Sequence, residues 1–200
     1  GVLPLDAMTS HLRKVVSIVA VAAVFASAVS AAHAGLPPDV PDSARGTGSV
    51  DDGNPRVETR LIVDKARAEP GGSLRAGVHF AIDPDWHVYW RNSGDSGMST
   101  EIRWSAENAT FGDLLWPAPE VHEEGDGEIV TFGYTDEVVL QAPVTVGGEA
   151  SGTLEVTAKV DYLACKVDCI PGAATMTREI AIGDGEKSAS KKERELLDAA

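Results

Sequence analysis

The stretch "LEVTAKVDY" at residues 154–162 sets the fold class, because apolar and polar side chains alternate along its whole length. The stretch "SLRAGVHFAI" at residues 73–82 alternates in the same way. A period of two places every second side chain on one face of a strand, so each stretch predicts a strand with one buried and one polar face. Such strands are typical of antiparallel sheets that pack on one side. His79 falls on the polar face of its strand, and we expect it at the surface.

Further strands are expected wherever short apolar stretches lie between turn residues. They are residues 57–64, 100–105, 128–132, 138–146 and 176–182. The segments "EPGG", "NSGDSG" and "GGEASG" between them are rich in the residues that tolerate tight turns. About seven short strands joined by such turns predict an all-β fold, most plainly an immunoglobulin-like antiparallel β-sandwich.

The N-terminal residues predict export. From Met8 a short basic stretch precedes an apolar run that closes with Ala32-His33-Ala34, which is the order of a secretory signal peptide cleaved after Ala34. We therefore expect residues 1–34 to be a signal peptide with an upstream extension, and the processed chain to be periplasmic. The same apolar run is just long enough for a membrane anchor that stays.

Three further segments follow the leader. Residues 35–56 are rich in Pro, Gly, Asp and Ser, which predicts a disordered linker. The folded domain is expected at residues 57–183. Residues 184–200 predict a charged helix with Leu196 and Leu197 on one side, yet the helix stops without a cap or a partner for these leucines. We therefore expect this segment to begin a further region.

The charge of the chain excludes one class of partner. It holds 17 basic and 31 acidic residues, with a formal net charge of −14. Proteins that bind nucleic acid neutralise phosphates with Lys and Arg. Nucleic acid is therefore not an expected partner.

The only two cysteines, Cys165 and Cys169, are separated by three residues and allow three interpretations. A structural disulfide across so short a loop would stabilise the fold by only on the order of 2 kcal/mol. A copper or zinc site would need more ligands than this pair supplies, and His87 and His122 are the candidate co-ligands. Redox exchange requires that one sulfur be open to another protein's thiolate.

The neighbours of the pair do not decide among these interpretations. The cysteines follow a predicted strand and share a turn with Lys166, which favours a thiolate. Asp161 and Asp168 disfavour it. The aromatic residues of "DPDWHVYW" at 83–90 allow a ligand platform, although a core or a structural loop is the more usual role.

Four motifs follow one another along the chain: "DPDWHVYWRNSGDSGMSTEIRWS" (83–105), "WPAPE" (116–120), "VTFGYTDEVVL" (130–140) and "KVDYLACKVDCIPG" (159–172). In this order and spacing they resemble the N-terminal periplasmic domain of DsbD-type thiol:disulfide interchange proteins. The C-x3-C pair followed by Ile-Pro is most similar to the ScsB branch. The resemblance covers about residues 57 to 183.

The resemblance implies an immunoglobulin-like domain that acts as a protein-disulfide reductase and needs no cofactor beyond its cysteines. In that family a membrane domain passes electrons to a thioredoxin-like domain, which reduces the cysteine pair, and the pair then reduces client proteins. The implied partners are thioredoxin-fold proteins as donor and client, with a membrane electron-transfer domain in the same or another chain. Cytochrome c biogenesis and copper tolerance are the implied processes.

The resemblance also implies roles for single residues. Cys169 matches the cysteine that attacks the client disulfide, and Cys165 matches its resolving partner. Phe132 and Tyr134 match a cap that shields the pair from oxidants, although Phe132 is equally suited to the core of its strand. The competing function is a non-enzymatic periplasmic binding module with a structural disulfide, which could also bind copper.

Overall fold

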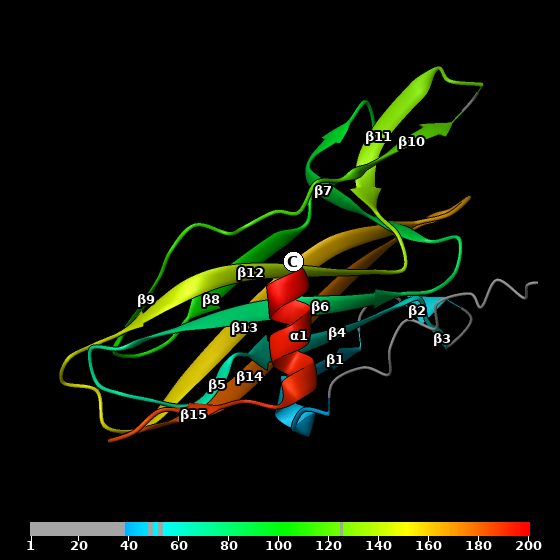
Figure 1. The fold of residues 1–200 in the computed structure, drawn as a ribbon. Helices are drawn as coiled ribbons and strands as arrows, with labels where there is room; N and C mark the ends of the chain where they lie inside the picture. Colours follow the sequence, from blue (N-terminus) through cyan, green and yellow to red (C-terminus); the bar gives the residue numbers. More distant parts are fainter. Residues whose placement is uncertain (1–38, 48–49, 52–53, 125) are drawn as a thin grey trace, which may run out of the picture. The chain divides into compact units, whose positions relative to one another are not determined.

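The computed structural model describes residues 39–47, 50–51, 54–124 and 126–200. The predicted signal peptide lies outside these residues. The described part of the chain folds into two large antiparallel sheets, apart from one short parallel pairing, and ends in one α-helix (Figure 1). A 3-10 helix, η1 (Asp42–Ala44), precedes the strands, and a small separate sheet pairs β2 (Val50–Asp51) with β3 (Asn54–Pro55). The all-β sandwich that the alternating stretches predict is confirmed.

The first large sheet has five strands among the described residues. In spatial order they are β1 (Arg45–Thr47), β4 (Val57–Val63), β6 (Ser73–Ile82), β12 (Glu137–Val146) and β9 (Ala109–Phe111). The second has eight strands in the same part of the chain. Its order is β10 (Glu120–Glu124), β11 (Ile129–Tyr134), β7 (His87–Gly94), β13 (Gly152–Cys165), β14 (Cys169–Ile182), β5 (Lys65–Ala68) and β15 (Lys187–Ser188), with β8 (Glu101–Ser105) also paired to β13.

The core lies between the two large sheets and is built from the apolar faces of their strands. Phe80 of β6 and Tyr162 of β13 are fully buried and meet edge to face, with ring centroids 5.6 Å apart. Both belong to the alternating stretches from which the fold was predicted. Aromatic pairs in this geometry add to the stabilisation from burial alone, so this contact joins the two sheets at their centre.

Residues 39–47 correct one prediction. Where the composition predicts a disordered linker, the structure has η1 and then β1, which pairs with β4 from Arg45↔Arg60 to Thr47↔Glu58. Val40 and Ala44 are buried. Backbone hydrogen bonds to an open strand edge require no apolar pattern in the added strand, so composition alone does not reveal this pairing.

The helix α1 (Lys191–Ala199) corrects a second prediction. The partner that the sequence analysis did not find for its two leucines is the sheet beneath it, and Ser190 caps the N-terminus of the helix in a capping box with Glu193. Leu196 and Leu197 are buried, and the helix packs across β4, β6 and β12 (Figure 1). Gly77 of β6 permits this approach, because a Cβ there would lie 2.8 Å from Leu197 Cδ2.

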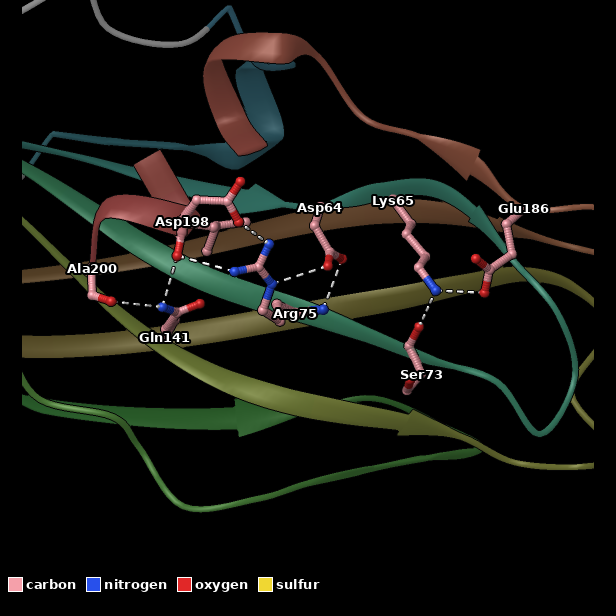
Figure 2. Close-up of polar contacts among 9 residues, drawn as sticks. Asp64, Lys65, Ser73, Arg75, Gln141, Glu186, Asp198 and Ala200 are labelled. Atoms are coloured by element: carbon pink, nitrogen blue, oxygen red, sulfur yellow. Dashed lines mark hydrogen bonds and ion pairs between the residues drawn. The ribbon is translucent and has the colours of Figure 1, made fainter. Parts of the chain in front are cut away.

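Polar side chains of the sheet fasten the C-terminal end of α1 (Figure 2). Arg75 donates to the Leu197 carbonyl at 3.1 Å and to Asp198 at 2.7 Å, while its Nε donates to Asp64 at 3.1 Å. Gln141 donates to the same Leu197 carbonyl at 2.9 Å. The two bonds to Leu197 satisfy a carbonyl in the last turn of the helix, where carbonyls have no partner within the helix. The last turn of α1 is thereby held by the strands beneath it.

The helix also explains why His79 is not at the surface. The polar face of β6, on which His79 lies, is the face that α1 covers, and His79 is only 1% exposed. Its Nε2 lies 3.1 Å from a Glu137 carboxylate oxygen. Burial lowers the pKa of His79 below its ordinary value, against the opposing effect of the hydrogen bond to Glu137.

Candidate functional site: the Cys165–Cys169 pair

The cysteine pair forms the last rung of a long hairpin. Strands β13 and β14 pair without a shift from Gly152↔Ile182 to Cys165↔Cys169. The two cysteines are joined by a disulfide, and their Cα atoms are 4.2 Å apart. Residues 166–168 form the turn, which the Lys166 amide closes by donating to the Asp168 carbonyl at 3.1 Å. The pair therefore sits where a rigid ladder gives way to a short exposed turn.

The two sulfur-bearing residues differ in exposure. Cys165 is buried, with 2% of its surface exposed, whereas Cys169 is exposed. Val167 between them is 90% exposed and presents an apolar side chain beside the pair. Thiol–disulfide exchange requires access of the attacking thiolate to one sulfur. Of the two residues, Cys169 is the more accessible.

Two of the charged neighbours that the sequence analysis weighed against each other, Lys166 and Asp161, form ion pairs of their own. Lys166 Nζ lies 2.9 Å from an Asp85 carboxylate oxygen, next to the turn. Asp85 has a positive φ of 69°, a conformation that aspartate tolerates better than most residues. Asp161 is bound by Arg103. The charges of Lys166 and Asp161 are thus partly balanced by these partners.

The residue that pairs with the buried cysteine, His87, packs against two further rings. His87 pairs with Cys165 across β7 and β13, and it is 6% exposed. Its ring stacks on His122 with centroids 4.7 Å apart and planes 18° apart, and Tyr89 meets it edge to face at 5.0 Å. The structure therefore brings together the two histidines that the sequence analysis named as co-ligands. Among the residues that the structure describes, no group of three or more His, Cys, Asp or Glu side chains is arranged to hold a metal ion.

The strand that carries His87 was missed from the sequence. The aromatic motif "DPDWHVYW" suggested a core or a structural loop, but its second half begins β7. Strand β7 lies between β11 and β13, so its residues alternate between the core and the face that carries Cys165. A signal was present, since His87 and Tyr89 alternate with the apolar Val88.

With this geometry in place, comparison with known proteins identifies the family. The family described as "Thiol:disulfide interchange protein DsbD, N-terminal" matches residues 58–180. The chain belongs to this family. The match includes both cysteines and every strand from β5 to β13.

A solved structure shows the same fold. The N-terminal periplasmic domain of ScsB from Proteus mirabilis matches with a TM-score of 0.54 and 21% identity, over 78% of this chain and 57% of that one. The N-terminal domain of DsbD from Neisseria meningitidis, in its reduced form, matches with a TM-score of 0.36 and 15% identity, over 65% of this chain and 90% of that one. This chain thus spans little more than half the length of the ScsB domain. Among curated proteins, none matches the chain significantly in sequence.

Membership of the DsbD N-terminal family links the disulfide to a general activity. Thiol–disulfide interchange is the general activity of the family, and the Cys165–Cys169 pair at C-x3-C spacing fits it. No helix within the described residues is long and apolar enough to cross a membrane.

The residues predicted to form a cap lie on β11, two strands from the cysteines. Phe132 is half-buried and meets Trp90 edge to face at 6.3 Å. Tyr134 pairs with Val88, which pairs with Ala164, and all three belong to the core. The Tyr134 hydroxyl donates to the Pro117 carbonyl at 2.9 Å, and burial raises its pKa above the ordinary value.

These contacts place the Tyr134 ring on the other side of the sheet from the disulfide. Neighbouring residues of a strand point to opposite faces, so Cys165 and His87 face away from the core that Ala164, Val88 and Tyr134 enter. The cap role of Phe132 and Tyr134 stays a prediction.

Proposed function

We propose that this chain is a periplasmic thiol–disulfide exchange domain that relays electrons from a thioredoxin-like donor to client disulfide proteins. The observation that carries the proposal is the unequal exposure of the pair, with Cys169 exposed and Cys165 buried. Exchange through two cysteines needs one sulfur that meets the partner and a second that resolves the intermediate. Periplasmic residence is part of the proposal, supported by the family and by the predicted signal peptide.

The relay consists of two thiolate attacks in each direction. In the dithiol form, the Cys169 thiolate attacks a client disulfide, and one client sulfur leaves as a thiolate. Cys165 then attacks the Cys169 sulfur of the mixed disulfide, which releases the second client thiolate and closes the Cys165–Cys169 bond. Two electrons have passed to the client. A reduced thioredoxin-like donor restores the dithiol by the same steps in reverse, so the chemistry needs no group besides the sulfurs.

Several finer parts of the proposal rest on family resemblance. They are the reductase direction, the membrane electron-transfer domain as the upstream source, the cap formed by Phe132 and Tyr134, and roles in cytochrome c biogenesis or copper tolerance. The exposed Val167 supports a protein partner, since an apolar side chain next to the reactive sulfur suits a protein surface better than a small hydrophilic thiol.

Trapping tests the proposal directly. The reduced Cys165→Ser variant should accumulate a mixed disulfide with an oxidised thioredoxin-fold protein, because Cys169 attacks and nothing resolves the product. The matched Cys169→Ser variant keeps only the buried thiol and should trap little. Non-reducing electrophoresis and intact mass measure both. If neither variant traps a partner, the competing function remains, a binding module with a structural disulfide.

A further inference from the structure

The face of the eight-stranded sheet beside the disulfide carries one feature that the relay has not used. His87 and His122 stack there, next to the buried cysteine. Gly133 of β11 lies between the strands of the two histidines, and a Cβ there would clash with the Val88 carbonyl oxygen and would contact His122 Cδ2 at 3.6 Å. The two stacked rings therefore come from strands of one sheet, with β11 between them.

The second attack of the relay poses a problem that this position can solve. Cys165 must lose its proton before it can attack the mixed disulfide, because the thiolate is the nucleophile. Its exposed fraction is 2%, so bulk water has little access to take that proton. Cys169 is exposed and has no such restriction.

His87 is the titratable residue placed opposite Cys165 in the sheet. The side chains of directly paired residues lie on the same face, with Cβ atoms roughly 4.5–5.5 Å apart, which brings an imidazole within reach of the sulfur. Imidazole is the side chain whose ordinary ionisation lies nearest neutral pH. The ring is held on one side by His122 and at its edge by Tyr89.

We propose that His87 accepts the proton of Cys165 during resolution of the mixed disulfide, and that His122 positions its ring. This inference rests on the proposed function. The S–H bond of Cys165 breaks and its proton passes to His87. The sulfur then bonds to Cys169 while the bond from Cys169 to the client sulfur breaks, and the client leaves as a thiolate. His87 afterwards returns the proton to the leaving thiolate or to solvent, so protons and electrons balance.

The charged and titratable groups around His87 come from every neighbouring element. They are Tyr89 on β7, Glu120 and His122 on β10, Cys165 on β13, and the Lys166–Asp85 pair at the turn. The two rings stack with their centroids 4.7 Å apart, so His122 fixes the orientation of the His87 ring.

The reaction of the reduced protein with 5,5′-dithiobis(2-nitrobenzoate) separates the two attacks. Each attack releases one coloured thiolate, so stopped-flow absorbance shows a first phase from Cys169 and a second from Cys165. We expect His87→Phe, which keeps a ring in the stack, to slow the second phase by about tenfold or more while the first phase stays within about twofold. His87→Gln should give the same split, and circular dichroism checks that both variants fold.

The wild-type protein gives a second, independent readout. Its second-phase rate should rise with pH through the imidazole range and then level off, because the base is then fully neutral. If the logarithm of the second-phase rate instead rises with unit slope against pH up to the range in which free thiols ionise, the proposal is overturned, whatever the variants do. The proposal is also overturned if the second-phase rate of His87→Phe lies within twofold of the wild-type rate, or if the substitution slows both phases equally. If the wild-type pair can be reduced but does not react with the reagent, the proposed function itself fails. That result differs from a failure of the His87 proposal alone, in which both phases are present.

Discussion

Each of the two large sheets buries a histidine on a face that the apolar–polar alternation of its strand predicts to be exposed to solvent. The two histidines are covered in different ways. His79 lies on the five-stranded sheet under α1. The helix covers a surface of β4, β6 and β12, which we call the helix face. His87 lies on the eight-stranded sheet, on what we name the disulfide face, the outer surface that carries His87, His122 and Cys165.

The difference separates stability from reactivity. The helix face is closed by a helix and its buried leucines, and Glu193 of that helix also forms an ion pair at 3.0 Å with Arg178 of β14 in the other sheet. The disulfide face carries the stacked rings of His87 and His122, and its hairpin ends at an exposed cysteine. Substitutions on the helix face should therefore lower the free energy of unfolding and leave the rate of thiol–disulfide exchange unchanged. Substitutions on the disulfide face should change the rate of exchange more than the free energy of unfolding.

The largest loss of stability is expected from Glu193→Ala. Glu193 is 1% exposed, accepts from Arg178 at 3.0 Å and from Ser190 Oγ at 2.8 Å, and completes the capping box. Removing one partner of a buried ion pair costs about 3–5 kcal/mol, because the other charge stays buried. Urea unfolding measures this loss. Glu193→Gln, which keeps the shape and the cap, should lose less, and equal losses would contradict the role of the charge.

Leu197→Ala should cost about 2–5 kcal/mol, because it removes a fully buried side chain between α1 and the sheet. Leu115→Ala is the matched control, since Leu115 is 53% exposed and its truncation should change the free energy of unfolding by less than about 0.5 kcal/mol. The rate at which reduced glutathione attacks the Cys165–Cys169 disulfide should be unchanged in both. A slowed reaction in Leu197→Ala would show that the two faces are coupled.

These two faces also mark what the sequence could predict. The strands of residues 73–82 and 154–162 follow from strict alternation, and the cysteine turn follows from the end of the second stretch. The burial of His79 could not be predicted, because its cover is a helix from the far end of the chain and Gly77, which admits that helix, looks like any strand glycine. The stack of His87 on His122 depends on pairing between strands that are distant in sequence.

A smaller effect is expected from His79, and it depends on pH. Burial lowers the pKa of His79 in the folded state below its ordinary value near 6.5. The unfolded chain therefore binds a proton first as the pH falls, and stability declines below about pH 6.5. Comparing the free energy of unfolding at pH 7.5 and pH 5.5 should show a smaller decline for His79→Phe than for the wild type. Identical declines in the two proteins would contradict this assignment.

The smallest effect on stability is expected at Val167. This residue is 90% exposed, so Val167→Ser should change the free energy of unfolding by less than about 0.5 kcal/mol. It should nonetheless slow exchange with a thioredoxin-fold protein several-fold, since the apolar contact beside Cys169 is lost, and should leave exchange with glutathione unchanged. Slowing of both reactions would mean that Val167 shapes the turn instead of meeting a partner.

The equilibrium reduction potential of the Cys165–Cys169 pair tests the central claim most directly. The protein would be equilibrated in glutathione buffers of known ratio, and the thiols counted by alkylation and mass. An exchange-active pair should have a potential well above about −300 mV, in the range of thioredoxin-like oxidoreductases. A potential below about −300 mV is typical of structural disulfides. That result would contradict the relay and make this pair a staple at the end of its hairpin.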